Sequence, residues 1–414
     1  MAYILIFLFI MKRILFFVVS VFCAYQSHAQ QVKSIQLRPL NNPKNFHPIV
    51  RLGEILELSF DDLEADSKEY YYQITHMTYQ WKPSAMSSNQ YIEGFDQNNI
   101  QQMTNSFNTL QGYTHYSVRF PNANTQITKS GNYLITILDD DYNEVFQRRC
   151  VFYEDLSTVG VAVYRSRNQL NDQDQTVQFK VNHPKIILNN PNQEIKATLI
   201  QNGNWNTAIN DIPPVFIQPN QLIYNHTQLT NFKGNNEFLN FDTKYIRSTS
   251  LNIANVVRDD LYNTYLFSNE PRAKLPYRYN PDINGHYIIH TLDTKEPSTE
   301  ADYSVVHFSL AIPEPYSKAS VYVYGGFNNF DLNEENLMTY NEEAKAYEAK
   351  LVLKQGFYNY GYALVRDGNL SLHSVDGSFF QTENEYTAII YYRPIGGFYD
   401  RVIGVGYGFF NQNN

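Results

Sequence analysis

Cysteine is almost absent from this sequence, whose 414 residues include only Cys23 and Cys150. Cys23 falls in an N-terminal segment that we expect to be removed, which would leave Cys150 without a partner in the chain. A disulfide framework and a cysteine zinc site each need several cysteines, so both are excluded. The fold must therefore be held together by apolar cores.

Positive charge is also scarce. Lysine and arginine number 32 against 41 aspartate and glutamate residues, which gives a net charge of −9. Proteins that bind nucleic acid gain affinity when basic side chains release counterions from phosphates, so nucleic acid is not an expected partner. Beyond the N-terminal segment, no stretch is long and apolar enough to span a bilayer as a helix, and we expect no direct insertion into lipid.

The N-terminal segment has the pattern of a secretory signal. Lys12 and Arg13 precede an apolar run over residues 14–24, and residues 27–29 read Ser-His-Ala. These are the basic region, the apolar region and the small-residue cleavage site of a signal peptide. We predict a cleaved signal peptide over residues 1–29. A membrane anchor is the alternative, but the apolar run is shorter than the roughly 20 residues that a spanning helix needs.

Aromatic residues, in contrast, are plentiful, with 34 Tyr and 27 Phe beside only 2 Trp. Such a composition is typical of strands, and few stretches show a helical period. Residues 54–63 and 70–81 alternate apolar with polar side chains, and turn residues separate the segments of this kind. We predict a mainly β protein in which three tandem immunoglobulin-like or early-set β-sandwich domains follow the signal peptide.

Three blocks are expected along the chain. Residues 30–156 form an N-terminal sandwich, and residues 157–297 form a middle sandwich with an irregular extension. Residues 298–414 form a C-terminal early-set-like sandwich, whose sheet is closed by residues 385–410. No internal repeat is obvious in the sequence.

Motifs that carry catalysis are missing. The sequence has no Gly-x-Ser-x-Gly, His-Glu-x-x-His, Cys-x-x-Cys or phosphate-loop pattern. His286 and His290 fall in a stretch that reads as a strand, where side chains four residues apart lie about 13 Å from each other and cannot share one ion. The run Asp139, Asp140 and Asp141 could gather oxygens around Ca²⁺, although a solvated hairpin tip explains it equally well. We predict a protein that is not an enzyme, with no catalytic residues, no cofactor and no metal.

The C-terminal block resembles the sandwich modules of glycogen- and starch-active enzymes. The resemblance rests on residues 325–328 (Gly-Gly-Phe-Asn), on residues 356–360 and on the turn at residues 367–368. Those modules bind sugar rings by stacking them on exposed tryptophans. In this chain Phe330 lies near the first stacking position, and no tryptophan follows Trp205. A carbohydrate-binding accessory protein is therefore the alternative function.

Landmarks in all three blocks occur in the order typical of one family. They are "YIEGFDQNNI", "SFNTLQGYTHYSVRFPN", "SGNYLI", "QNGNW", "GNNEF", "DINGHY", "EADYSVVHF", "KQGFYNYGY" and "TENEYTAIIYYR". Along its mature length the chain resembles the plug proteins of the bacterial type IX secretion system. One departure is Met77, where many members carry cysteine.

The resemblance implies a non-enzymatic periplasmic protein that is monomeric within its complex. Its partner would be the giant outer-membrane translocon barrel of that system, whose periplasmic opening it would occlude while no cargo is engaged. The sequence does not indicate which part enters the pore.

One loop is a candidate contact with the partner. In "YRPIGGFYDR" (residues 392–401) a proline and two glycines interrupt the strand pattern, and arginine and aromatic side chains are frequent interface anchors. A structural turn between the last two strands is the alternative interpretation. The predicted partner-binding residues are Arg393, Pro394, Phe398, Tyr399 and Arg401.

Overall fold

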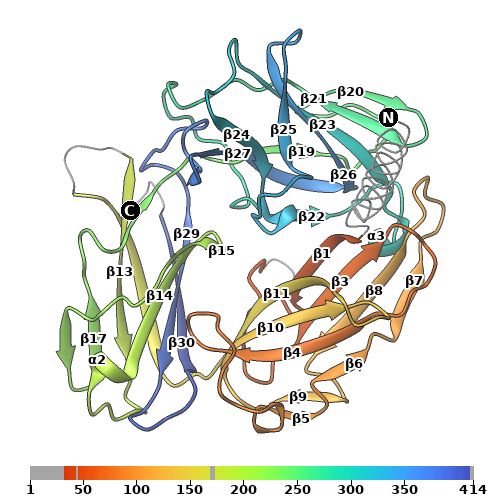
Figure 1. The fold of residues 1–414 in the computed structure, drawn as a ribbon. Coiled ribbons are helices and arrows are strands. Elements are labelled where there is room, and N and C mark those ends of the chain that lie inside the picture. Colours follow the sequence, from red (N-terminus) through yellow and green to blue (C-terminus); the bar gives the residue numbers. More distant parts are fainter. Residues whose placement is uncertain (1–31, 43–44, 168–172, 411–414) are drawn as a thin grey trace, which may run out of the picture.

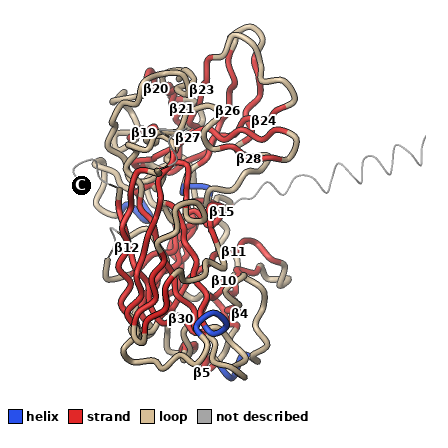
Figure 2. The backbone as a smooth tube through the Cα atoms, turned by 90° about the vertical axis from the view of Figure 1, so that its left-hand side faces the viewer, coloured by secondary structure: helices blue, strands red, loops and turns tan. Residues whose placement is uncertain are grey.

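Strands make up nearly all of the regular structure, as the sequence predicts (Figures 1 and 2). The computed structural model describes residues 32–42, 45–167 and 173–410, so the predicted signal peptide lies outside the described residues. The helices of these ranges are single turns: η1 (Ser88–Gln90), α2 (Pro191–Glu194), α3 (Pro297–Glu300) and η2 (Gly326–Asn328). None of them is long or apolar enough to cross a membrane.

The N-terminal sandwich consists of two packed sheets. In sheet order, the first is β1 (Val32–Pro39), β3 (Leu56–Asp62), β8 (Thr114–Phe120) and β7 (Gln102–Asn105). The second is β2 (Ile49–Arg51), β11 (Glu144–Tyr153), β10 (Gly131–Leu138), β4 (Tyr71–Met77) and β6 (Gln97–Asn99), and β5 (Ile92–Gly94) pairs separately with β9 (Thr125–Ile127). Leu56, Leu58 and Phe60 of β3 are fully buried between the sheets, as their two-residue period predicts.

The middle sandwich combines residues 158–233, the first part of its sequence block, with the end of the chain. One sheet is β12 (Thr158–Arg165), β13 (Asp174–Asn182), β17 (Gln221–Tyr224) and β16 (Phe216–Gln218), with β18 (Asn231–Lys233) also on β13. The other is β15 (Asn204–Ile209), β14 (Ile195–Gln201), β29 (Glu385–Tyr392) and β30 (Arg401–Phe409).

The prediction that residues 385–410 close the C-terminal sheet is therefore wrong. β29 pairs with β14 along seven residues, from Ile195 opposite Tyr392 to Gln201 opposite Tyr386. The glycines of "GVGYG" in β30 allow β12 to lie close on top, because a Cβ at Gly406 would come within 2.4 Å of the Val159 carbonyl oxygen. An apolar strand pattern shows that a strand is buried but does not identify the sheet that it joins.

The third body is one large, strongly bent sheet. Its order is β19 (Leu239–Asp242), β27 (Gly356–Arg366), β24 (Ala319–Tyr324), β25 (Leu337–Asn341), β26 (Ala346–Lys354), β23 (Tyr303–Ala311), β21 (Tyr262–Leu266) and β20 (Ile253–Arg258). β22 (Tyr287–Ile289) and β28 (Asn369–Ser371) pair with β27 as well. Residues 239–289, expected in the middle block, thus pair with the third body, which is inserted between β18 and β29. The domain boundaries at residues 156 and 297 stay a prediction.

The three bodies surround a common centre (Figure 1). β1 and β11 of the N-terminal sandwich, the tip of the β14–β15 hairpin and β22 of the third body all lie near this centre. Separate apolar cores fill the three bodies. A further core joins the N-terminal and middle sandwiches through Ile49 and Val151 on one side and Ile200, Ile389 and Val402 on the other. The contacts between the bodies therefore hold them in a fixed arrangement.

Candidate functional site

The predicted contact loop connects β29 with β30 at the boundary between the middle and N-terminal sandwiches. Within the loop, the Arg393 guanidinium forms two hydrogen bonds of 2.8 Å with the carboxylate of Asp400. Asp400 is 3% exposed, and its second oxygen also accepts the backbone N–H of Tyr79 at 2.9 Å. The arginine that was predicted to meet a partner thus stabilises the loop and its attachment to the segment that follows β4.

Arg401 at the end of the loop pairs with Glu154 of the N-terminal sandwich. Its guanidinium donates to both carboxylate oxygens, at 3.0 and 2.6 Å, and the Ser130 hydroxyl donates to Glu154 at 2.6 Å. Burial alone would raise the pKa of Glu154, but the hydrogen bonds from Arg401 and Ser130 outweigh it and lower this pKa. The pair is a charged contact between two bodies of the same chain.

We expect Arg401→Gln to lower the free energy of unfolding by about 1–2 kcal/mol, between the values for exposed and for buried ion pairs. Urea unfolding would measure the change. Arg51→Gln is a matched control, because Arg51 and Asp155 form a longer and more exposed pair, with 3.5 Å between their charged atoms. A loss no larger than that of the control would show that the Arg401 pair does not hold the two bodies together.

The remaining loop residues differ in exposure. Tyr399 packs against the N-terminal core, with its ring 5.8 Å from that of His76, whereas Pro394 is half-buried. Phe398 is 56% exposed and Ile395 is 66% exposed, which leaves two apolar side chains on the surface. Sequence reasoning missed Ile395, although an apolar residue between Pro394 and Gly396 in a loop was a signal. A role of this loop in partner binding stays a prediction.

A buried ion pair joins the N-terminal sandwich to the third body. Asp61 of β3 and Lys354 at the end of β26 are 2.6 Å apart, and their side chains are 1% and 2% exposed. The second carboxylate oxygen of Asp61 lies 2.6 Å from His115 Nδ1, and the Tyr303 hydroxyl donates to Asp61 at 2.7 Å. The Lys354 ammonium lies 4.1 Å from the centre of the Tyr113 ring. Sequence reasoning missed this cluster because its members are far apart in the chain.

Asp302 strengthens the same boundary. Its carboxylate accepts the backbone N–H groups of Leu110, at 2.7 Å, and Gln111, at 3.1 Å, in a loop of the N-terminal sandwich. The Tyr113 hydroxyl donates to the Ala301 carbonyl at 2.8 Å. These polar groups on both sides of the boundary are therefore paired, as burial of polar groups requires.

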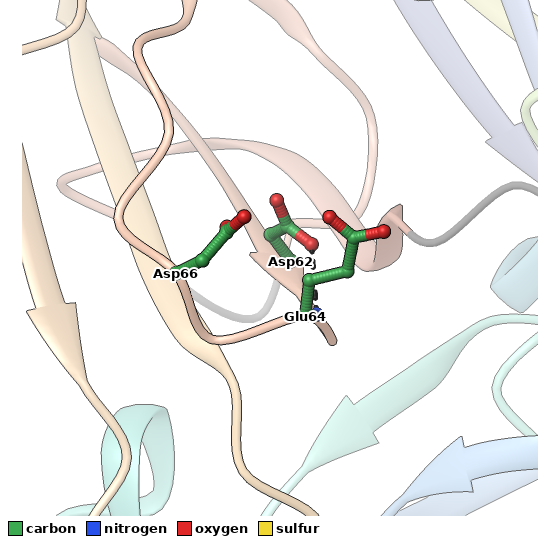
Figure 3. A group of neighbouring side chains, drawn as sticks. All are labelled: Asp62, Glu64 and Asp66. Carbon is green, nitrogen blue, oxygen red and sulfur yellow. Dashed lines mark hydrogen bonds between the residues drawn. The ribbon is translucent and has the colours of Figure 1, made fainter.

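Three carboxylates also converge near this boundary (Figure 3). Asp62, Glu64 and Asp66 offer oxygens within 4.8 Å of one another, and they are the one such group in the described ranges. The Lys68 ammonium pairs with both Asp62 and Glu64, and the Tyr70 hydroxyl donates to Asp62 at 2.8 Å. The Lys68 ammonium thus offsets part of this negative charge, and the Tyr70 hydroxyl satisfies one oxygen of Asp62.

The acidic turn at residues 139–141 lies in a β-hairpin, and the two histidines considered in the sequence lie beside a short strand. Asp139 accepts the backbone N–H of Asn143 at 2.8 Å within the hairpin turn, while Asp140 and Asp141 are exposed. His286 and His290 flank the three-residue strand β22, as the strand reading of that stretch predicts.

The C-terminal block resembles sugar-binding modules, but it has no exposed stacking surface at Phe330. Phe330 is 7% exposed and belongs to a small buried cluster with Tyr324 and Ala363. The two tryptophans, Trp81 and Trp205, pack edge to face with ring centres 4.7 Å apart. These side chains contribute to packing inside and between the bodies.

Comparisons with known proteins support one family. The model of the "Type 9 secretion system plug protein 1st domain" family matches residues 32–154, which are the N-terminal sandwich. A crystal structure of a hypothetical protein from Parabacteroides merdae ATCC 43184 is 31% identical, with a TM-score of 0.88, and the match covers 92% of this chain and 98% of that one. The curated proteins gave no significant match.

Proposed function

The chain belongs to the type 9 secretion system plug protein family, and from this premise we propose that it closes the translocon of that system. In this proposal it is a non-enzymatic periplasmic protein, exported by its signal peptide. It docks on the periplasmic opening of the giant outer-membrane barrel and occludes the pore while no cargo is engaged. It acts as a monomer within the complex and needs no cofactor.

The observation that supports a stopper best is the way in which the three bodies are joined. A wide pore can be closed only by an object that keeps its shape. The N-terminal sandwich contacts the third body through the buried pair of Asp61 and Lys354, and it contacts the middle sandwich through Arg401 and Glu154. The apolar core between the N-terminal and middle sandwiches adds to these contacts. Relative motion of bodies is the default expectation unless the interface between them is extensive and apolar, and this shared core is apolar.

A pull-down from the native bacterium in mild detergent tests this function. We expect the C-terminally tagged chain to recover one very large outer-membrane barrel, identified by mass spectrometry. The recovered barrel should carry no cargo, because cargo and plug would occupy the pore at different times. Recovery of polysaccharide-processing enzymes without a barrel would contradict the proposal and favour the carbohydrate-binding alternative.

A variant pair locates the contact. Phe398→Asp places a charge on the exposed apolar side of the predicted contact loop, and we expect it to reduce recovery of the barrel at least tenfold if the loop is the contact. Phe409→Asp is the matched control, since Phe409 is similarly exposed, at 59%, at the far end of β30. Equal recovery with both variants would remove the loop from the interface.

A further inference from the structure

A cavity of about 490 Å³ lies where the three bodies meet. Its wall includes β1 and β11 of the N-terminal sandwich, the turn between β14 and β15, residues 286–287 and the loop that follows η2. This volume falls within the range of about 300–1,000 Å³ that is usual for ligand pockets. The cavity is distinct from the loop of residues 392–401, and its chemistry does not depend on whether the chain closes a pore.

Three arginine side chains belong to the cavity wall, namely Arg38 from β1 and both Arg148 and Arg149 from β11. Arg38 and Arg148 are half-buried, and Arg149 is exposed. Burial raises the pKa of Tyr287, and the charges of Arg38 and Arg148 oppose this shift. Two guanidinium groups from different strands therefore lie near the same tyrosine of the third body.

Few of the hydrogen-bond donors on these arginines have an acceptor within the chain. Each guanidinium group carries five N–H donors. Arg38 donates to the Tyr287 carbonyl at 2.5 Å, and Arg148 donates to the Gln147 carbonyl at 2.8 Å. Arg149 lies over aromatic rings instead, and among the described residues no carboxylate forms an ion pair with any of the three. Most of these donors can therefore serve an acceptor that enters the cavity.

Two carboxylates also belong to the cavity wall, and both have other partners. Glu144 accepts a hydrogen bond of 2.7 Å from the Gln147 side chain. Asp331 accepts one of 3.0 Å from Asn329. Asp331 also attracts the two arginines of β11 from a distance, but it forms an ion pair with neither.

The two histidines in the wall add no unmatched charge. His47 Nε2 lies 3.1 Å from a carboxylate oxygen of Glu385, and burial lowers the pKa of His286 well below its ordinary range. Three arginines against two carboxylates therefore leave an excess of positive charge in the wall. Burial lowers the pKa of each arginine, as expected for cations that lack a close counter-charge.

We propose that this cavity binds a small organic molecule through one oxyanion group, a carboxylate or a phosphate, which accepts hydrogen bonds from Arg38 and Arg148. Guanidinium groups recognise such oxyanions through paired, charge-assisted hydrogen bonds. Ile35, Phe46 and Leu134 belong to the same wall and offer apolar contacts to the rest of the molecule. An inorganic ion would satisfy the arginines but would leave these apolar side chains without a partner.

Two probes of similar shape and different charge test the site. The purified chain is titrated at low salt with cyclohexanecarboxylate and with the neutral cyclohexanecarboxamide, while the intrinsic fluorescence is recorded. Trp205 lines the cavity and packs against Trp81, so a bound molecule should change the emission. We expect a saturable change with the carboxylate and at least tenfold weaker binding of the amide, because only the carboxylate is charged.

Cyclohexyl phosphate in the same assay distinguishes the two oxyanions. Tighter binding of the phosphate or of the carboxylate identifies the group that the site prefers, and either result supports the proposal. Inorganic phosphate is the control for an ion without an organic part, and we expect it to bind at least tenfold more weakly than the better of the two organic probes.

Variants of the arginines test which side chains hold the oxyanion. Arg38→Gln and Arg148→Gln are each expected to weaken binding of the carboxylate at least fivefold. Arg258→Gln on β20 should leave it unchanged, because Arg258 is exposed and lies outside the cavity. Arg38 also joins two bodies through the Tyr287 carbonyl, so thermal unfolding of each variant checks that the fold is retained. The comparison of the charged and neutral probes needs no variant and is decisive even if a variant is unstable.

Four results would each overturn the proposal. They are the absence of a saturable change with both organic oxyanions, equal binding of the carboxylate and the amide, inorganic phosphate that binds as tightly as the organic probes, and a folded Arg148→Gln variant that binds the carboxylate as tightly as the wild type.

Discussion

Lys354→Met is expected to lower the free energy of unfolding by about 3–5 kcal/mol, the usual loss when one partner of a buried ion pair is removed. The reason is the carboxylate that remains. Asp61 is 1% exposed, and the Lys354 ammonium is 2.6 Å from one of its oxygens. The Tyr303 hydroxyl would still donate to Asp61, but it carries no compensating charge. Burial lowers the pKa of Lys354 even though Asp61 opposes that shift, which shows how strongly the site is removed from solvent.

Urea unfolding of the wild type and variant measures this loss. Lys350→Met is the matched control, because Lys350 lies on the same strand but is exposed, and we expect its effect to be within about 0.5 kcal/mol. The double variant Asp61→Leu with Lys354→Met should recover most of the stability, since no charge is then left buried. A single variant as stable as the control would mean that water reaches the boundary and that the two bodies separate readily.

The local pattern of the sequence predicts the strands well. In β3 the apolar residues Leu56, Leu58 and Phe60 point into the sandwich, and the intervening Glu57 and Ser59 are partly exposed. Side chains of a strand alternate between two faces, so burial of one face is recorded directly in the order of the residues. The mainly β fold follows from many such segments.

The order of apolar and polar residues does not show which strands pair with each other. β29 is buried along nearly its whole length, and that pattern would suit a central position in either of two sheets. Its true neighbour, β14, lies nearly 200 residues earlier. Lys354 is a similar case, because it falls on the polar face of β26 and its ammonium pairs with Asp61 of the N-terminal sandwich. Contacts between bodies depend on docking, which a two-residue period does not describe.

In the candidate contact loop, too, the local sequence does not reveal which residues pair with distant parts of the chain. Arg393 and Arg401 were selected because arginine is frequent at interfaces, yet each forms a two-pronged pair with a carboxylate of its own chain. Glu154, the partner of Arg401, is far away in the sequence and gave no local signal. The exposed side chains of Ile395 and Phe398 are what the loop offers to another molecule.

Stability should fall as the pH rises from about 5 to 8, and Glu237 is the main expected cause. Its side chain is 1% exposed, and one carboxylate oxygen accepts hydrogen bonds from the Tyr277 hydroxyl, at 2.5 Å, and the Glu383 N–H, at 3.1 Å. Burial raises the pKa of Glu237 to about 7, from 4.5 for an unperturbed glutamate. Between these values the folded state binds the extra proton, so deprotonation destabilises it relative to the unfolded chain.

Glu237→Gln removes this deprotonation while keeping the shape and the acceptor oxygen. At pH 8 we expect the variant to be more stable than the wild type by about 1–3 kcal/mol, and at pH 5 the two should be nearly equal. Urea unfolding at both pH values measures the difference, and Glu342→Gln, with a side chain that is 74% exposed, is the control. Asp282, whose pKa burial raises to about 6, should leave a smaller slope in the variant. A difference between Glu237→Gln and the wild type that does not change with pH would show that Glu237 is ionised throughout this range and that water or a rearranged partner stabilises its charge.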